Sequence, residues 1–169
     1  MEIHRTLHLI LKLRFMRYCI AAVLTIMIAM NSFGQSTEKV IPSGWAKDFI
    51  IEFSYTGSMD GSRTVGKITY DSCVIVYQAG HKAPVRGTYR MKENDRSTIL
   101  KKLQDLKADR INSEASVVAV NDGYSQFIRI GDIYLSGGPS FEMTEDSRLR
   151  FGEVYHYLEG FALKKTNPR

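Results

Sequence analysis

Cysteine is scarce in this 169-residue chain, which contains only Cys19 and Cys73. Cys19 lies in an N-terminal segment that we expect to be removed, so the remaining domain has one thiol and no internal disulfide. We therefore expect the hydrophobic core to hold the fold together, although the predicted destination is oxidising. Cys73 is expected to be a small buried residue of a strand rather than a reactive thiol.

The apolar run near the N-terminus is too short to span a membrane. Cys19–Met30 has twelve uncharged residues, which as a helix would reach ~18 Å, whereas a hydrocarbon core is ~30 Å thick. Basic residues precede the run and small residues follow it: Arg5, Lys12, Arg14 and Arg17 before it, Ser32 and Gly34 after it. This order is typical of a secretory signal peptide. We predict that residues 1–34 are cleaved off between Gly34 and Gln35, and that the protein is periplasmic or secreted.

Two alternatives concern the same segment. It could be an uncleaved membrane anchor that extends back to Leu7, although Lys12, Arg14 and Arg17 interrupt that stretch. Met16 followed by Arg17 would by itself begin a compact signal, so residues 1–15 could be an upstream extension from a misassigned start codon. N-terminal sequencing of the precursor decides between these starts.

The charge of the mature domain is close to neutral. Residues 1–34 hold four of the 23 Lys/Arg and one of the 18 Asp/Glu, which leaves 19 basic and 17 acidic residues and a net charge of +2. The high isoelectric point of the whole chain, near 9.2, is therefore partly a property of the leader. Because a high positive charge was the main reason to expect a nucleic-acid partner, the near-neutral mature domain gives little support for one.

Catalytic motifs are absent from the sequence. There is no Gly-x-Ser-x-Gly elbow, phosphate loop, Cys-x-x-Cys or calcium loop. Outside the leader only His81 and His156 remain, and the composition around His81 is that of an exposed hairpin tip. Glu153 and His156 have the spacing of four-helix metal sites, but no second such pair could face them. We predict no catalytic residues, no metal and no cofactor, with an enzyme using Glu153 and His156 as the least favoured alternative.

Hydrophobic periodicity predicts one α+β domain with the order ββββ-α-βββ-α. Alternation with a period of two predicts a sheet of about seven strands, antiparallel or mixed, over 49–56, 63–70, 73–78, 85–92, 117–120, 124–130 and 133–136. A leucine-rich helix begins with Asn94 or Asp95 as N-cap, and Thr144 caps the last helix. We expect both helices on one face of the sheet. The predicted bounds are a flexible lead-in over 35–46, the domain over 47–164 and a tail over 165–169.

Two groups of residues are candidates for binding. Arg86, Arg90 and Lys92 share one side of the fourth predicted strand, where they could meet an anionic polymer or an acidic partner; a solvated sheet face or edge protection is the alternative. The second group has one tyrosine in or beside each early strand, and stacked tyrosines can hold sugar rings. Because each lies on the more apolar side, core packing is the favoured interpretation for Tyr55, Tyr70, Tyr77 and Tyr89.

The glycine-rich turn Tyr55-Thr56-Gly57-Ser58-Met59-Asp60-Gly61, within this order of elements, resembles small exported bacterial domains of unknown function. More distantly, the layout over about residues 47–163 resembles emfourin-like protein inhibitors of thermolysin-type metalloproteases. Those inhibitors favour a Gly-Gly pair where this chain has Thr56-Gly57. The resemblance implies that Ser58, Met59 and Asp60 contact a protease.

These observations favour an exported, non-catalytic protein-binding module, with proteases among the candidate partners. The alternative is an envelope-associated structural protein that binds anionic glycans through Arg86, Arg90 and Lys92. We expect a monomer or weak oligomer, no nucleic-acid partner, and no membrane span once the signal is removed.

Overall fold

The computed structural model describes residues 40–57, 60–115, 123–139 and 141–167. The chain divides into two units, Met1–Glu38 and Lys39–Arg169, and all described residues belong to the second. The predicted signal peptide, with its cleavage site between Gly34 and Gln35, lies outside the described residues, as does the predicted strand over 117–120.

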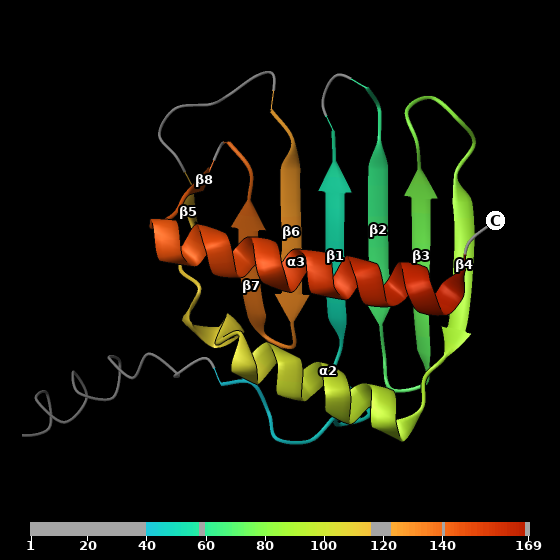
Figure 1. The fold of residues 1–169 in the computed structure, drawn as a ribbon, viewed down its shortest axis with the longest axis vertical. Helices are drawn as coiled ribbons and strands as arrows, with labels where there is room; N and C mark the ends of the chain where they lie inside the picture. The colour runs from blue at the N-terminus through green and yellow to red at the C-terminus, as the bar shows by residue number, and fades with distance from the viewer. Residues whose placement is uncertain (1–39, 58–59, 116–122, 140, 168–169) are drawn as a thin grey trace, which may run out of the picture. The chain divides into compact units, whose positions relative to one another are not determined.

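Six antiparallel strands form the main sheet, in the order β4-β3-β2-β1-β6-β7 (Figure 1). The first four strands are connected by short turns, as their alternating sequences predict. β6 then pairs with β1, and the sheet continues on the other side of the first strand. Gly131, with a φ of 57°, makes the tight turn between β6 and β7. The strands are β1 Ile51–Thr56, β2 Arg63–Ile68, β3 Ser72–Gln78, β4 Val85–Arg90, β6 Ser125–Ile130 and β7 Ile133–Gly137.

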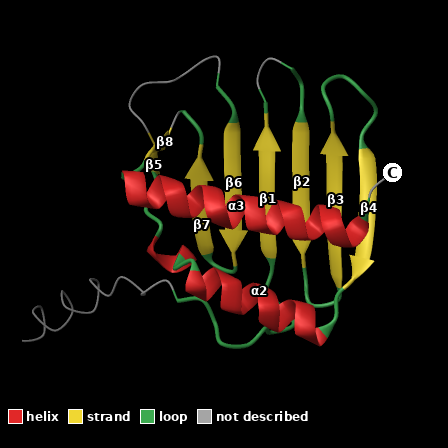
Figure 2. Cartoon of the chain, in the orientation of Figure 1, coloured by secondary structure: helices red, strands yellow, loops and turns green. Residues whose placement is uncertain are grey.

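Two helices lie on one side of this sheet (Figures 1 and 2). α3, Glu145–Thr166, crosses the strands and packs against β1, β3, β4 and β7. α2, Glu93–Asp105, lies beside it near the strand ends and leads into the short 3-10 helix η1, Ala108–Arg110. The strands β5, Glu114–Ala115, and β8, Phe141–Glu142, form a separate pair. The predicted α+β class and the placement of both helices on one face are confirmed, whereas β5 and β8 have no counterpart in the prediction.

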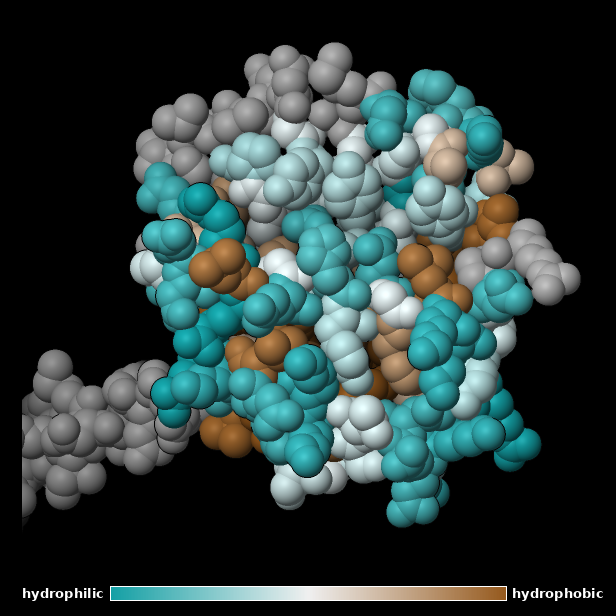
Figure 3. All heavy atoms as spheres, in the orientation of Figure 1, coloured by the Kyte–Doolittle hydropathy of each residue, from teal (hydrophilic) through white to brown (hydrophobic). Residues whose placement is uncertain are grey.

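The hydrophobic core lies between the sheet and the two helices. Every second residue of the central strands points inward, so that Ile51, Phe53 and Ile128 are almost completely buried. The ring of Phe53 meets that of Tyr155 on α3 edge to face, with centroids 6.0 Å apart. In Figure 3 further hydrophobic side chains are visible between α3 and α2. Burial of these side chains is the main favourable term in folding.

The two helices begin differently, and one predicted cap is wrong. Thr144 caps α3 as predicted, because its Oγ1 accepts a hydrogen bond from the backbone N–H of Ser147 at 3.2 Å. α2 begins two to three residues before the predicted position, with Lys92 as its N-cap residue. Asp95 lies inside the first turn, where Oδ2 accepts the Lys92 N–H at 3.2 Å and the Tyr89 hydroxyl at 2.9 Å.

The packed domain extends beyond the predicted range 47–164 at both ends. Ile41, which was assigned to the lead-in over 35–46, is 4% exposed and belongs to the core. The Trp45 indole N–H donates to the Phe49 carbonyl at 2.9 Å, and the Gln104 side chain donates to the Pro42 carbonyl at 3.1 Å. At the other end α3 runs to Thr166, so part of the predicted tail is helical.

Within the described part of the chain, none of the helices has the length and apolar character needed to cross a membrane.

Cys73 is expected to resist thiol reagents in the folded protein. Its side chain is fully buried, and burial raises the pKa of its thiol to about 12. The thiolate, which is the reactive form, is then on the order of one part in ten thousand at pH 8. A chromogenic disulfide reagent should therefore react slowly with the native protein and at once in denaturant. Rapid reaction without denaturant would contradict the burial of this residue.

Candidate functional site

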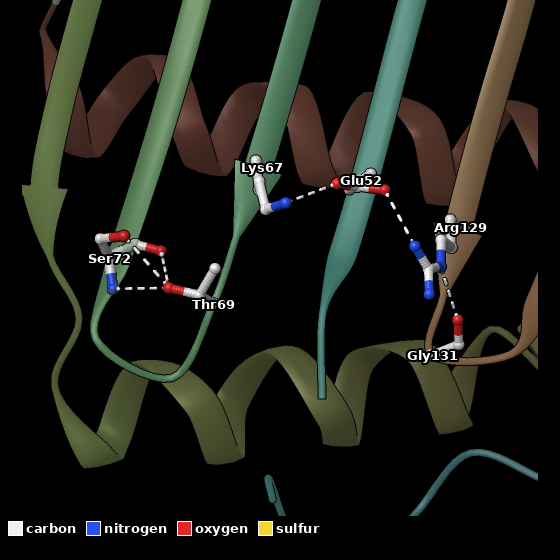
Figure 4. Close-up of polar contacts among 6 residues, drawn as sticks. All are labelled: Glu52, Lys67, Thr69, Ser72, Arg129 and Gly131. Atoms are coloured by element: carbon white, nitrogen blue, oxygen red, sulfur yellow. Dashed lines mark hydrogen bonds and ion pairs between the residues drawn. The ribbon is translucent and has the colours of Figure 1, made fainter. Parts of the chain in front are cut away.

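Arg86 and Arg90 lie on the side of the sheet that faces away from both helices, which we call the open face. No described helix or strand covers it, and the strand residues on this side are exposed or half-buried. Figure 4 looks onto this face: Lys67, Glu52 and Arg129 project toward the viewer from three adjacent strands, with both helices behind the sheet. The turns at one end are braced by hydrogen bonds of Thr69 with Ser72 and of Arg129 with the Gly131 carbonyl.

The open face is strongly cationic. Its only carboxylate among the described strand residues is Glu52, which pairs with Lys67 at 2.8 Å and with Arg129 at 3.4 Å. The hydrogen bond from Lys67, supported by Arg129, lowers the pKa of Glu52 and keeps it ionised. The cations, taken from strand alternation and register, are Arg63, Lys67, Arg86, Arg90 and Arg129.

Three of these arginines have no counter-charge among the residues that the structure describes. Arg63, Arg86 and Arg90 are exposed, and none of them forms an ion pair or side-chain hydrogen bond with another described residue. Arg63 lies on β2 and Arg86 on the edge strand β4, with β3 between them. Their charge is therefore available to a partner.

An apolar strip runs between these cations. The strand register places Arg86, Val76, Val65 and Phe127 in one row across the sheet, with Ser54 between the last two. Tyr134 on the edge strand β7 is 55% exposed, and its ring lies 6.2 Å from that of Phe127. The strip and its cationic border resemble the composition of protein interfaces, which have an apolar centre and are rich in Arg and aromatic residues.

Lys92, predicted to act with Arg86 and Arg90, lies beyond the strand that carries them. β4 ends at Arg90, and Lys92 is the exposed N-cap residue of α2, with its backbone N–H bound to Asp95. The continuous alternation assumed for 85–92 therefore stops before Lys92. Of the three predicted cations, the structure brings Arg86 and Arg90 together on the open face.

The turn implicated by the inhibitor resemblance is described only in part, because Ser58 and Met59 lie outside the described residues. Asp60 is exposed, and its carboxylate accepts hydrogen bonds from the Ser62 hydroxyl at 2.7 Å and the Ser62 N–H at 2.8 Å. These bonds lower the pKa of Asp60. Ser62 also accepts the Gly80 N–H at 3.0 Å, which ties this turn to the β3–β4 hairpin near the exposed His81. The carboxylate of Asp60 therefore stabilises the turn that contains it through hydrogen bonds to Ser62.

A pocket of about 680 Å³ lies on the other side of the sheet, between the first half of α3 and strands β1, β6 and β7. Its walls include Tyr55 and Tyr124, whose rings are stacked with centroids 5.8 Å apart. His156 lines the pocket, whereas Glu153 is exposed and is not part of its lining. Of the alternative catalytic pair, only His156 therefore belongs to the described lining of the pocket.

The four tyrosines singled out in the sequence have separate surroundings. Tyr55 lines the pocket, and Tyr89 donates its hydroxyl hydrogen bond to Asp95 at 2.9 Å. The Arg96 guanidinium lies 4.0 Å from the centre of the Tyr70 ring, and Tyr77 is 40% exposed. They do not form a common platform for a sugar polymer.

No metal-binding group of three or more His, Cys, Asp or Glu side chains occurs among the residues that the structure describes. Comparison with known proteins returned no matching family model and no matching curated protein. The open face and the pocket are the two surfaces of the described domain that could bind a partner or a ligand.

Sequence reasoning missed most of the open face. Arg63 and Lys67 of β2 and Arg129 of β6 carry the same alternating signal as Arg86, but β2 and β6 are far apart in the chain. Pairing of β1 with both β2 and β6 is needed to place them together. Tyr55 and His156 were singled out in the sequence and both line the pocket, but nothing in the sequence predicted that they would share one.

Proposed function

We propose that this protein is an exported, non-catalytic binding module whose open face holds an acidic surface of a protein partner. The observation that carries the proposal is a group of three exposed arginines, Arg63, Arg86 and Arg90, on the open face. Within the described part of the chain, none of them has a counter-charge and no helix or strand covers them. Export is taken from the predicted signal peptide over residues 1–34.

Charge complementarity favours an acidic partner, since like-charged or neutral surfaces would leave these arginines unpaired. The apolar strip of Val65, Val76 and Phe127 favours a protein over a glycan. A glycan chain offers hydroxyl and anionic groups to cations but little apolar surface for such a strip. An inhibitor of a protease is one form of such a module, and a protease with an acidic surface would be its target.

The proposal is tested by reversing the uncompensated charges. In the variant Arg63→Glu, Arg86→Glu and Arg90→Glu, capture of the partner should be lost, because three attractive contacts become repulsive. A matched control reverses three exposed lysines on the helices, Lys101→Glu, Lys102→Glu and Lys164→Glu, with the same change in net charge. Both variants should melt near the wild-type temperature, because the substituted side chains are exposed.

The measurement is quantitative capture of envelope-fraction proteins by the three immobilised proteins, followed by titration of each purified captured protein. We expect at least one protein that binds wild type and control, that binds the open-face variant about tenfold or more weakly, and whose affinity falls with added salt. Equal binding by all three proteins would refute the proposal. Capture that survives proteolysis of the fraction but not glycan digestion would instead establish the glycan alternative.

A further inference from the structure

We infer that the pocket between α3 and the sheet binds a small organic anion with a flat apolar body, such as an aromatic carboxylate. This site lies on the helix side of the sheet, so it is separate from the open face. The inference goes beyond the proposed function, and each can fail without the other.

The pocket has the size and the walls of a ligand site. Its volume of about 680 Å³ lies in the range of small-molecule pockets. The stacked rings of Tyr55 and Tyr124 form one wall, and Tyr124 is 47% exposed. Phe141 and Met143, from β8 and the segment after it, add further apolar lining. A flat ring could stack on such a wall.

Strand register explains why this space is open. Tyr55, Gln126 and Gly137 lie in one row across β1, β6 and β7, directly beyond the core row of Phe53, Ile128 and Leu135. Gly137 has no side chain, and the Phe151 ring occupies the place of its missing Cβ, with the nearest ring carbon 2.5 Å from it. This row of residues therefore lines the pocket and does not form another layer of the core.

The polar groups of the pocket favour an anion. Arg148 and His156 on α3 line it together with the amide of Gln126, and no carboxylate lines it among the described residues. The guanidinium of Arg148 forms no ion pair or side-chain hydrogen bond with any described residue. A guanidinium can donate two parallel hydrogen bonds to one carboxylate, a geometry that a neutral amide cannot match.

Gly152 provides a direct way to close the pocket. It lies inside α3, where glycine is less favourable than alanine by about 1 kcal/mol. A Cβ built at this position meets no atom within 4 Å, and the residue lines the pocket. A larger side chain would project into this space without displacing the core. Gly160, on the same helix, also has open space around it but does not line the pocket, which makes it a matched control.

The experiment uses Gly152→Leu, Gly160→Leu and Arg148→Gln. Phenylacetate and indole-3-acetate are the probes, with phenylacetamide and indole-3-acetamide as neutral counterparts, and binding is measured by calorimetry and ligand-observed NMR. We expect the carboxylates to bind wild type and Gly160→Leu alike, and to bind Gly152→Leu about tenfold or more weakly. Arg148→Gln should remove the preference for carboxylate over amide.

The proposal fails if no probe binds wild type, if Gly152→Leu binds as well as wild type, or if amides bind as well as carboxylates. Melting curves verify that Gly152→Leu is folded. If it is not, Arg148→Gln decides the question alone, because Arg148 is exposed and its replacement leaves the core unchanged. Unchanged carboxylate preference in Arg148→Gln would then overturn the inference.

Discussion

Replacing Gly66 with alanine is expected to destabilise the protein by about 3 kcal/mol, because the added methyl group has no space. Gly66 lies in β2, opposite Phe53 of β1. A Cβ at this position would overlap with Cζ of the Phe53 ring. The Phe53 side chain is 1% exposed and packs against Tyr155, so its ring cannot move aside without disturbing the core.

The matched control is Gly160→Ala, which adds the same methyl group at an open helical position. It should stabilise the protein by up to about 1 kcal/mol, since alanine is the better helix former. Urea denaturation of both variants should therefore give shifts of opposite sign. Phe53→Leu in the Gly66→Ala background should recover part of the loss, measured as a coupling energy in a double-mutant cycle. Equal urea midpoints for Gly66→Ala and wild type would show that the two positions do not pack as described.

Replacing Asp95 with alanine is expected to lower the free energy of unfolding by about 2–3 kcal/mol. Its side chain, 10% exposed, joins three elements: it accepts hydrogen bonds from the Tyr89 hydroxyl of β4 and the Lys92 N–H of α2, and it pairs with Lys165 of α3 at 2.8 Å. All three contacts are lost together. Glu93→Ala is the control, because Glu93 is an exposed acidic residue of the same first turn. It should change stability by less than about 1 kcal/mol.

The effect of Asp95→Ala should depend on pH. Burial by itself raises the pKa of Asp95, but the hydrogen bonds from Lys165, Tyr89 and Lys92 outweigh it and hold the pKa below its usual value. The folded state therefore binds this proton less readily than the unfolded state. The stabilisation that ionised Asp95 contributes to the fold is complete above the unfolded-state pKa of about 3.9. It is lost as the pH falls through the folded-state pKa. Urea denaturation of wild type and Asp95→Ala should differ most near pH 7 and converge in acid; a constant difference would contradict the assignment.

Local patterns predicted the elements well where one face of an element is buried. The alternation in β1 and β4 reflects a sheet with a core on one side, and the apolar stripe of α3 reflects packing on the same core. Thr144 was recognisable as a cap because a cap depends on neighbours within one turn. The predicted N-cap of α2 was wrong because the Asp95 side chain instead accepts a hydrogen bond from Tyr89 and pairs with Lys165. Both partners lie in other elements, so the sequence around Asp95 does not reveal these contacts.

The ends of the domain were misjudged for a similar reason. Residues 35–46 look polar as a segment, but Ile41 is a single core residue within it. Lys165 looks like part of a charged tail, but it pairs with Asp95 across the domain. A contact made by one residue leaves no periodic signal in the sequence.

The scarcity of cysteine and the period of the hydrophobic residues were enough to predict a disulfide-free α+β domain with one buried thiol. These properties depend on composition and on neighbours a few residues apart. The open face and the pocket were decided by the pairing of β1 with β6, which brings residues near 55 and 126 into one row. Several strands have similar alternating patterns, so local sequence does not show which of them pair. The pairing is determined by the packing of the whole core.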